Sequence, residues 1–307
     1  MRVFVLGGTG AIGRHVVPAL IAAGHTVSAL ARSAEKAAWL REQGATPALV
    51  SLFDRDALTG AFAGHDAVAN LASAMPSMSH FLRTKAFGAN TRVRVEGSAA
   101  VANAALAAGV GRLVQESVAM LYPDRGANWI DEATPIDRYP MAEANLAAED
   151  SARRFADAGR TATVLRFGLF YGPGAAHSEQ MFVQASHHVA MVVGPPGSYL
   201  SSIHLTDAAS AVVAALDGPG GVFNVVDDEP LTKRHYAQAL AVAAGTSIWF
   251  KGPGRAALLL GDRLTSLTRS LRVSNGRMRG SGWAPRFPSA REGWIVTAGA
   301  LRSAPSG

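Results

Sequence analysis

Residues 2 to 24 read RVFVLGGTGAIGRHVVPALIAAG, and this segment combines three local patterns. Residues 2 to 6 form an apolar run of the length of a buried strand, and residues 11 to 24 place apolar side chains at helical spacing. Between them, the glycines at 7, 10 and 13 predict a tight turn that opens the helix. We therefore expect a strand, a glycine-rich loop and a helix in that order.

The glycine-rich loop is suited to a dinucleotide. A pyrophosphate must approach backbone N–H groups at the positive end of the helix, and side chains there would obstruct it. The pattern is informative here because a strand precedes it and a helix follows it. The loop residues that we expect to contact the cofactor are Gly7, Thr9, Gly10, Ala11, Ile12 and Gly13. The alternative is a structural turn without a ligand.

The end of the second expected strand bears on the choice of cofactor. Residues 28 to 33 read SALARS, and a carboxylate at this place would hold the ribose hydroxyls of NAD. Arg32 and Ser33 stand there instead and would attract a 2'-phosphate. Arg14, just inside the first helix, would add positive charge. We therefore expect NADP(H), and the alternative is an exposed arginine that binds nothing.

Strands and helices alternate through the first half of the chain. Strand patterns recur at about 26–31, 46–50, 67–71, 112–116 and 162–167, and helix patterns recur at about 35–43, 55–63, 85–108 and 141–158. Such alternation predicts an α/β fold with a parallel, doubly wound sheet.

The pattern becomes irregular in the second half of the chain. A last sheet strand is expected at 222–226, with helices at about 232–244 and 255–270. We predict an NADP-binding domain at residues 1–170 that also takes in the strand near 222–226. Residues 171–307 are expected to form mainly a smaller, substrate-binding lobe.

Composition excludes several classes of protein. The chain has 307 residues, of which 49% are hydrophobic, so it can bury a large core. It contains no cysteine, which excludes disulfides and thiolate metal sites and favours a cytoplasmic location. The apolar N-terminal run is too short for a secretory signal, and no apolar run approaches the roughly 18 residues of a membrane span. We therefore expect a soluble protein that does not enter a membrane.

Basic residues gather near the C-terminus. The net charge is +6, and residues 251–307 contain only Asp262 and Glu292 as acidic residues. The segment lacks the interleaved aromatic residues and the recognition motif of a nucleic-acid-binding surface. We expect no nucleic acid, and we interpret the charge as a solvated face with a few arginines near an anionic cofactor or substrate.

Six short motifs follow one another along the chain: GGTGAIG (7–13), VANLAS (68–73), LVQESVAMLYP (113–123), NLAAE (145–149), LRFGLFYGPG (165–174) and IHLTDAASAV (203–212). Their order and spacing resemble the extended short-chain dehydrogenase/reductase family, also called the NAD-dependent epimerase/dehydratase family, over nearly the whole chain. The resemblance implies a Rossmann domain with a C-terminal substrate lobe. It also implies nicotinamide contacts after the fourth and sixth strands, from Leu71, Ala72, Ser73, Phe167, Gly168 and Leu169.

The family's catalytic dyad has no counterpart here. The family places a tyrosine and, four residues later, a lysine at the start of a long helix, with the lysine directly before a segment like LAAE. Met141 and Asn145 stand at these two places, so the chain resembles an atypical member. Tyr139 precedes Pro140, which favours extended backbone before the helix, and Glu143 would raise the pKa of a nearby phenol. An alignment shifted by two residues, with Tyr139 as the acid, is the alternative.

Other side chains could supply the missing proton donor. The candidates are Ser117, Tyr122, Ser73 and His177. Each has a structural alternative, because a serine can cap a strand end, a tyrosine can pack in the core and a histidine can lie at the surface. The adjacent His187 and His188 have no clustered carboxylate partners, so we expect no metal.

A missing acid limits the substrates that can react. General acid catalysis lowers a barrier by roughly 3 to 5.5 kcal/mol, so its loss slows a ketone reduction without abolishing it. A quinone, or a ketone hydrogen-bonded to its own phenol, needs less help. We therefore expect an NADPH-dependent reductase of a ketone or quinone, with an aromatic polyketide or another secondary metabolite as small-molecule substrate, acting as a monomer or homodimer. The alternatives are a nucleotide-sugar epimerase or dehydratase and a non-catalytic NADP(H)-sensing protein.

Overall fold

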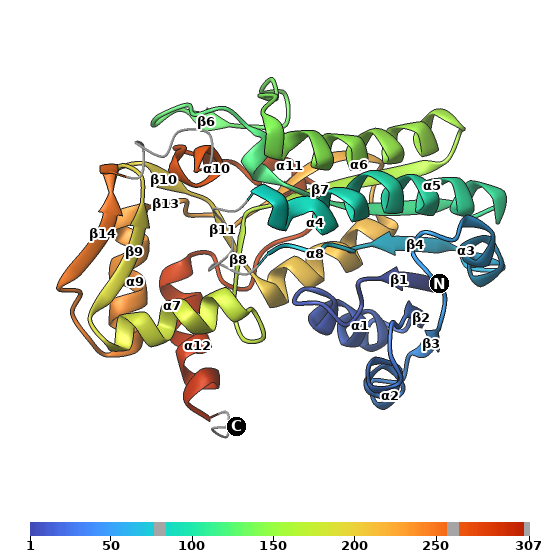
Figure 1. Cartoon of the computed structure of the whole chain (residues 1–307), viewed down its shortest axis with the longest axis horizontal. Helices are drawn as coiled ribbons and strands as arrows, with labels where there is room; N and C mark the ends of the chain where they lie inside the picture. Colours follow the sequence, from blue (N-terminus) through green and yellow to red (C-terminus); the bar gives the residue numbers. More distant parts are fainter. Residues whose placement is uncertain (77–83, 257–263, 304–307) are drawn as a thin grey trace.

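The structure is a computed structural model that describes residues 1–76, 84–256 and 264–303. Figure 1 shows a sheet between two layers of helices, with a smaller group of helices and short strands beside one end of the sheet. We call this smaller group the lobe.

Within the described residues, seven parallel strands form the central sheet in the order β12-β7-β5-β4-β1-β2-β3. Most of them are apolar runs that are buried on both faces, as a parallel sheet with helices on both sides requires. The strands are β1 (Arg2–Leu6), β2 (Thr26–Leu30), β3 (Thr46–Ala48), β4 (Ala67–Asn70), β5 (Arg112–Val118), β7 (Thr161–Phe167) and β12 (Gly221–Val225). This sheet confirms the predicted α/β class, including the late strand expected at 222–226.

The strand order reverses next to β1. The chain runs from β1 outward to β2 and β3, and then returns to the other side of β1 with β4. In open α/β sheets, ligands bind outside the carboxyl ends of the strands where the order reverses. The glycine-rich loop after β1 and Leu71 after β4 both lie at this point.

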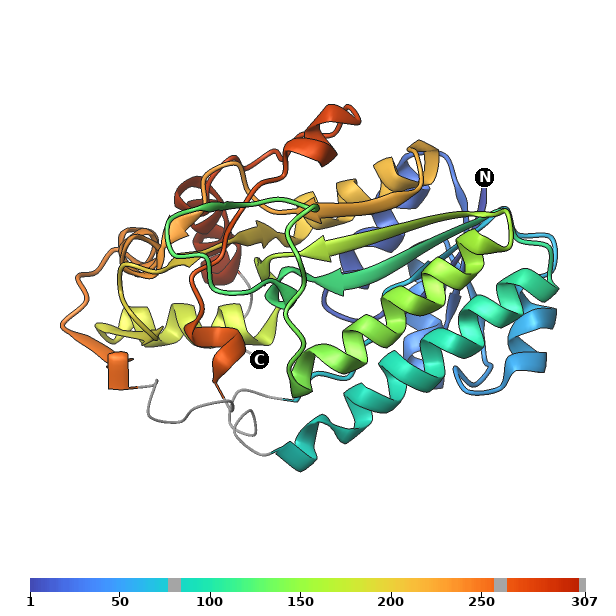
Figure 2. The same cartoon turned by 90° about the horizontal axis from the view of Figure 1, so that it is seen from above.

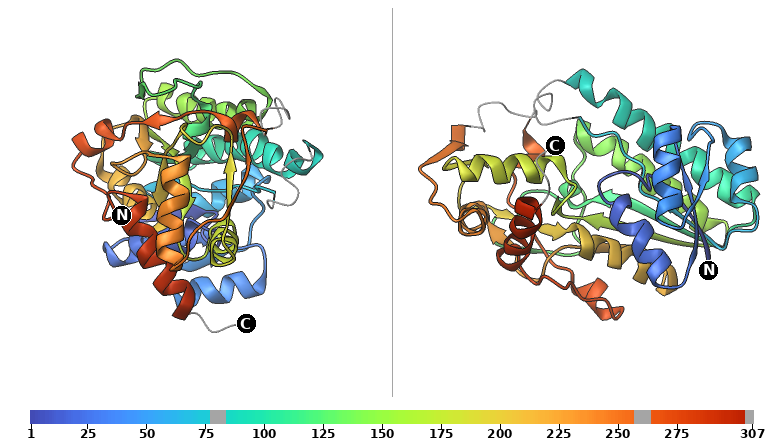
Figure 3. Two further views of the ribbon diagram at one scale, coloured as in Figure 1. Left: turned by 90° about the vertical axis from the view of Figure 1, so that its left-hand side faces the viewer. Right: turned by 90° about the horizontal axis from the view of Figure 1, so that it is seen from below.

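Helices cover both faces of the sheet. On one face, α1, α2 and α8 bury residues such as Val16 and Val212 against the strands. On the other face, α3, α5 and α6 bury residues such as Phe62 and Phe155. Figure 2 shows α5 and α6 side by side along the sheet, and the right-hand view of Figure 3 shows the opposite layer. These helices are α1 (Gly13–Ala22), α2 (Ala34–Glu42), α3 (Arg55–Phe62), α5 (Ser98–Ala107), α6 (Pro140–Asp157) and α8 (Leu205–Asp217).

Helix ends follow local sequence signals. The Ser33 side chain caps α2, and the Asp54 side chain caps α3, where it accepts a hydrogen bond from Ala57 N–H at 3.0 Å. α6 starts with Pro140, which needs no N–H partner in the first turn. The helix expected at 85–108 is a continuous run of η2 (Thr84–Phe87), α4 (Gly88–Arg92), the π-helical η3 (Val93–Gly97) and α5.

The lobe is built from helices and two-stranded pairings. Tyr171, Tyr236 and Trp294 lie at its centre, and the rings of Tyr171 and Trp294 stack with centroids 5.5 Å apart. Gly293 allows this contact, because a Cβ there would lie 2.1 Å from the Tyr171 hydroxyl. The pairs are β8 (Leu169–Tyr171) with β11 (Ser202–His204), β10 (Tyr199–Leu200) with β13 (Leu231–Thr232), β9 (Val189–Val193) with β14 (Phe250–Gly254), and β6 (Trp129–Ile130) with β15 (Arg272–Val273). Besides α8, the helices after β8 are α7 (Ala176–Ser186), α9 (Lys233–Ala244), α10 (Thr265–Thr268), α11 (Gly276–Gly280) and α12 (Ala290–Ser303), and η4 (Ala119–Leu121) follows β5.

The helix expected at 255–270 is seen only in part. Within the described part of that range, α10 is a single turn, and residues 257–263 lie outside the described residues. Just before this range, Phe250–Gly254 pairs as a strand with β9. The division into domains at residue 170 stays a prediction.

Candidate active site

The loop after β1 requires glycine at two positions. Gly7 has a φ of +78°, and a Cβ there would lie 2.5 Å from the carbonyl oxygen of Leu71. A Cβ on Gly13 would lie 2.1 Å from the carbonyl oxygen of Gly7. Non-bonded atoms do not approach so closely, so a side chain at either position would push the loop away from the helix or from the end of β4.

The loop leaves a helix N-terminus open to a ligand. No side chain in the described part of the chain caps α1, and Gly10 and Ala11 at its entrance are exposed. Gly10 N–H donates to the carbonyl oxygen of Gly7 at 2.9 Å, which closes the turn. Because the positive end of a helix dipole attracts anions, the shape and polarity of this loop fit the pyrophosphate of a dinucleotide. Thr9 and Ile12 complete the set of loop residues that we propose for this role.

Positive side chains border the region between α1 and α2. Arg32 is exposed at the end of β2, and the Ser33 hydroxyl accepts a hydrogen bond from Lys36 N–H at 3.3 Å as the cap of α2. The Arg14 guanidinium stacks on Trp39 of α2, 5.2 Å from the ring centroid. This stacking holds the positively charged Arg14 of α1 against α2, the helix that follows Arg32 and Ser33.

The ends of β4 and β7 frame the next part of the cleft. After β4, Leu71 is buried, Ala72 is half-buried and Ser73 is exposed. After β7, Gly168 packs so tightly that a Cβ there would lie 2.7 Å from the carbonyl oxygen of Ser201. Leu169 N–H donates to the same oxygen at 2.9 Å. The end of β7 is thereby joined to the segment that leads from β10 into β11 of the lobe.

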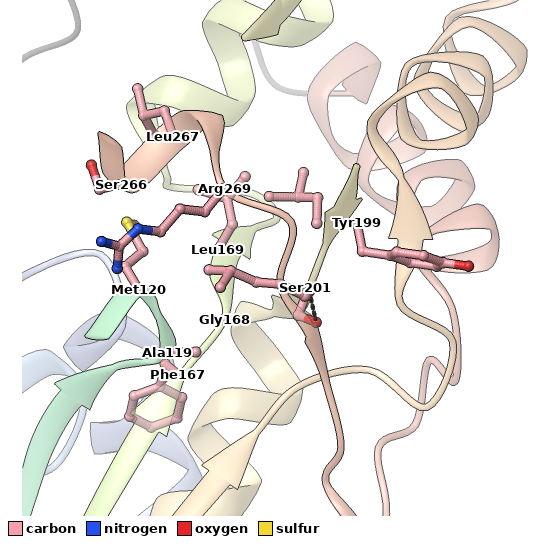
Figure 4. Close-up of a pocket in the computed structure, with 12 residues that line it drawn as sticks. Ala119, Met120, Phe167, Gly168, Leu169, Tyr199, Ser201, Ser266, Leu267 and Arg269 are labelled. Atoms are coloured by element: carbon pink, nitrogen blue, oxygen red, sulfur yellow. Dashed lines mark hydrogen bonds between the residues drawn. The ribbon is translucent and has the colours of Figure 1, made fainter. Parts of the chain in front are cut away.

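A pocket opens where the lobe meets the carboxyl ends of β5 and β7 (Figure 4). Its walls are mainly apolar, and Arg269 is the charged side chain among its described lining residues. The lining residues are Ala119, Met120, Phe167, Gly168, Leu169, Tyr199, Leu200, Ser201, Ser266, Leu267, Arg269 and Leu271. Apolar walls with one or two polar groups are typical of sites for small organic ligands.

Arg269 is held firmly in the pocket wall. Its side chain is 9% exposed, and Nη1 donates to the carbonyl oxygen of Tyr122 at 2.8 Å. Nη2 donates to the Asp137 carboxylate, and the guanidinium lies 4.3 Å from the ring centroid of Tyr139. Figure 4 shows the Arg269 side chain extending toward Met120.

Tyr139 lies just before α6, as the following proline predicted. Its backbone is extended, with φ −144° and ψ 161°, and its hydroxyl donates to the carbonyl oxygen of Met120 at 2.8 Å. Burial raises its pKa to about 12, with Arg269 opposing and Asp137 adding to the shift. The tyrosine is therefore neutral and a weak acid at physiological pH.

Ser117 belongs to a buried network beside the pocket. Its hydroxyl donates to the Glu149 carboxylate at 2.6 Å, and the two carboxylate oxygens accept from Arg166 at 2.8 and 2.6 Å. Burial would lower the pKa of Arg166, but the hydrogen bonds and charge of Glu149 raise it, so the guanidinium stays charged. The Ser117 hydroxyl is thus committed to an ion pair, and a catalytic role for it stays a prediction.

Tyr122 completes this network in the core. Its hydroxyl accepts from Arg166 Nη1 at 3.0 Å and donates to Asn224 Oδ1 at 2.8 Å, and the side chain is fully buried. Burial raises its pKa, although Arg166 opposes the shift. These contacts are those of a packed tyrosine with a satisfied hydroxyl, so its role as a proton donor also stays a prediction.

His177 lies in the first turn of α7, outside the lining of the pocket. Its Nε2 forms a hydrogen bond with the carbonyl oxygen of Phe170, and burial lowers its pKa. The imidazole is therefore neutral near pH 7 and anchors α7 to β8. Ser73 lies in the loop after β4, so its hydroxyl is the exposed one of the four predicted donors.

The start of α6 carries no tyrosine or lysine in the expected places. Met141 and Asn145 lie one helical turn apart there, and the only acidic residue of the first turn, Glu143, pairs with Arg138 at 3.0 Å on the surface. No group of three or more histidines and carboxylates that could hold a metal occurs among the residues that the structure describes. None of the helices described is long and apolar enough to span a membrane.

Sequence reasoning missed Arg269 and the residues around it. The pocket joins Ala119 and Met120 to Ser266, Leu267 and Arg269, which are far away in the chain. The excess of basic residues after position 250 was the one available signal, and it did not single out any arginine.

The sequence profile of the NAD dependent epimerase/dehydratase family matches residues 3–225. The chain belongs to this family. The match spans the glycine-rich loop and the central sheet as far as β12.

Relatives of known activity include two reductases. A 3-diazoavenalumate denitrifying reductase from a Streptomyces species is 33% identical over 312 residues, which cover 95% of this chain and 99% of that protein. A 4-hydroxy-2-methyl-3-oxo-4-farnesyl-3,4-dihydroquinoline-1-oxide ketoreductase from Stigmatella aurantiaca is 30% identical over 279 residues, covering 86% of this chain and 80% of that protein.

A solved structure has the same fold. The UDP-glucose 4-epimerase of Thermus thermophilus, in complex with NAD, matches with a TM-score of 0.81 and 26% identity over 99% of this chain and 100% of that chain. Together with the family match, it supports a nicotinamide cofactor for this chain. The family and its named members support an NAD(P)-dependent oxidoreductase or epimerase.

Proposed function

We propose that the protein is an NADPH-dependent reductase of an activated ketone or quinone, with an aromatic secondary metabolite as its small-molecule substrate. The observation that carries this proposal is the pocket itself. It lies at the carboxyl ends of β5 and β7, its walls are mainly apolar, and neither its described lining residues nor the start of α6 supply a tyrosine and lysine dyad. Such a site can position an aromatic ring for hydride transfer but gives little help with protonation.

The relatives support a reductase acting on an unusual aromatic compound. One is named as a ketoreductase of a dihydroquinoline oxide, and the other as a reductase of a diazo compound. Both names fit a substrate that accepts hydride readily. An aryl diazonium ion is a second candidate substrate, because its carbon gains hydride while the C–N bond pair leaves with N₂, and no proton is needed.

The cofactor would lie along the carboxyl edge of the sheet and would supply the hydride. We propose that the residues after β1 hold its pyrophosphate, and that Leu71, Ala72, Ser73, Phe167, Gly168 and Leu169 contact its nicotinamide. Arg32 and Arg14 offer cations and Ser33 a hydroxyl, with no carboxylate among them, which favours NADP(H). Michaelis constants for NADPH and NADH test this preference, and a lower constant for NADH would contradict it.

A nucleotide-sugar substrate fits the pocket less well. A nucleoside diphosphate brings two or more negative charges, whereas Arg269 is the one charged side chain among the described lining residues. A calorimetric titration with UDP and TDP separates the reductase proposal from the nucleotide-sugar alternative. Micromolar binding of either nucleotide would favour the epimerase or dehydratase alternative.

Turnover separates a reductase from a non-catalytic NADP(H) sensor. Purified protein and NADPH would be mixed with quinones, 2-hydroxyaryl ketones, an aryl diazonium salt and simple aldehydes, and each product identified by mass spectrometry. We expect NADPH oxidation with at least one aromatic class and little with aldehydes. Tight NADPH binding without oxidation across the panel would support the sensor instead.

A further inference from the structure

Arg269 has the position and charge of a group that acts on substrate. We propose that its guanidinium stabilises the negative charge that develops on the substrate oxygen during hydride transfer, in place of a proton donor. This inference rests on the proposed function, because it assigns a role to a residue of the same pocket.

The fixed position of Arg269 is the first argument. Its contacts to Tyr122, Asp137 and Tyr139 hold the guanidinium from three sides in the wall of the pocket. A charged donor that is already in place when the reaction begins needs no reorganisation, which is the condition for strong electrostatic stabilisation. The guanidinium has five N–H donors, and these hydrogen bonds use two of them.

The low polarity of the surroundings is the second argument. The neighbouring walls include Phe167, Leu267 and Leu271, which screen a charge far less than water does. Within the described lining residues no other cation competes for the role. The predicted donors Ser117 and Tyr122 are bound to Glu149 and Asn224, and Tyr139 donates to a backbone carbonyl.

The step balances without a proton. A C–H bond forms at the substrate carbonyl carbon as the C–H bond at nicotinamide C4 breaks, and the carbonyl π pair moves onto oxygen. NADPH is oxidised to NADP⁺, and the ketone is reduced to an alkoxide. A quinone gives the corresponding hydroxydienone alkoxide, which becomes a hydroquinone when the added hydrogen leaves the carbon as a proton and water protonates the oxygens. The anion is held by Arg269 and takes its proton from water after release.

Asp137 sets the strength of this effect. Its carboxylate pairs with Arg269 and is 45% exposed, so it partly neutralises the guanidinium from the solvent side. Removing the carboxylate charge should strengthen the attraction for an oxyanion, whereas removing the arginine should abolish it. The two changes act in opposite directions, which a merely structural role of the pair would not produce.

The test uses 4-nitrophenol, whose absorbance separates phenol from phenolate and which resembles an aromatic product anion. It would be titrated from pH 5 to 9 in the presence of the protein saturated with NADP⁺. We expect the bound phenol to ionise at least about one pH unit lower than the free phenol. Arg269→Met should remove this shift, and Asp137→Asn should enlarge it.

Arg272→Met is the matched control. Arg272 lies three residues further along, is also packed against aromatic rings, Trp129 and Tyr199, and does not line the pocket. It should leave the shift unchanged. The proposal is overturned if wild-type protein does not bind 4-nitrophenol, if the bound phenol ionises at its ordinary pH, or if Asp137→Asn and Arg269→Met change the ionisation in the same direction.

Kinetics with an active substrate give an independent readout. We expect Arg269→Met to lower kcat for an aryl ketone about 100-fold, which is the size of the loss when one oxyanion donor is removed. Guanidinium ions added to the solution should restore part of the lost kcat. Reduction of an aryl diazonium ion, which develops no oxyanion, should change little. If no compound is reduced but the phenolate shift is present, the proposed function fails, and only the binding of an aromatic anion by Arg269 stands.

Discussion

At the scale of single residues, the glycine-rich loop depends on positions where the backbone packs too closely for any side chain. Gly13 meets the backbone of Gly7, and Gly7 meets the backbone after β4, so the loop, helix and neighbouring strand are fitted to one another. The spacing of the glycines was visible in the sequence. The reason for it, an approach of 2.1 to 2.5 Å for an added Cβ, required the structure.

Gly13→Ala should damage the cofactor site. Its Cβ would meet backbone atoms that cannot rotate away, and overpacking of this kind costs about 1–3 kcal/mol of folding free energy. We expect the dissociation constant for NADPH, measured by its fluorescence, to rise at least about tenfold. The control is Gly60→Ala in α3, where an added Cβ has no neighbour within 4 Å and should leave binding unchanged. Equal affinity of the two variants would contradict this account of the loop.

Tyr139→Phe should leave turnover nearly intact. The hydroxyl is bound to the carbonyl oxygen of Met120, and burial raises the pKa to about 12, which makes the phenol a poor acid at neutral pH. We expect a loss of about 1 kcal/mol in unfolding free energy from the missing hydrogen bond, and a change in kcat of no more than a few-fold. A loss in kcat of about 100-fold or more would mean that this tyrosine is the acid after all.

At the scale of elements, α8 begins at a buried histidine whose protonation opposes folding. His204 caps the helix through Nδ1, which accepts from Thr206 N–H at 3.2 Å, and the side chain is 3% exposed. Burial lowers its pKa to about 4, with the charges of His15 and Arg286 contributing. The unfolded chain, with an ordinary histidine pKa of about 6.5, takes up the proton first. Stability from this group is therefore present above pH 6.5 and is lost as the pH falls toward 4.

His204→Asn should flatten this pH dependence. Asparagine keeps a capping oxygen but does not titrate. Between pH 7 and pH 4, the unfolding free energy of the variant should therefore fall by up to about 3 kcal/mol less than that of the wild type. Urea unfolding at several pH values in this range measures the difference. The exposed His187→Asn serves as the control and should follow the wild type. If the unfolding free energy of His204→Asn and of the wild type changed with pH in parallel, His204 would be ruled out as a source of the pH dependence.

Elements with strong local signals could be predicted, and those stabilised by distant partners could not. The strands and helices of the sheet up to β7 carry apolar runs, helical spacing or capping residues, and the sequence placed them within a few residues. Strands such as β10 and β15 have two residues each, and their partners β13 and β6 lie far along the chain. No local pattern identifies such pairs, so the strand pairings of the lobe were not predicted, whereas the helix expected at 232–244 is confirmed by α9.

At the scale of the whole molecule, the site forms only where distant segments meet. The glycine spacing and the family resemblance predict cofactor contacts at the loop after β1 and at the ends of β4 and β7, because recognisable motifs lie there. The pocket also needs η4 and the segment around α10, which the fold brings together at the carboxyl edge of the sheet. The sequence shows Met141 and Asn145 at the places of the dyad, whereas the role that we propose for Arg269 depends on tertiary contacts.

The double substitution Met141→Tyr with Asn145→Lys tests whether the site already manages without a dyad. It would place phenol and ammonium one turn apart at the start of α6. Because the proposed substrates accept hydride without concerted protonation, we expect kcat for a quinone to change by no more than about tenfold, well below the roughly 10² to 10⁴ that a needed acid supplies. A gain beyond that range would show that the natural reaction is limited by the missing donor.

The central claim, hydride transfer without simultaneous protonation, is tested most directly by isotope effects on one enzyme and one active substrate. Turnover would be measured with NADPH and with NADPH deuterated at the transferred position, each in H₂O and in D₂O, at pH values from 6 to 9. The account predicts a normal isotope effect from the deuterated cofactor and none from the solvent. A solvent isotope effect on the same step as the cofactor effect would contradict it, because a proton would then move together with the hydride.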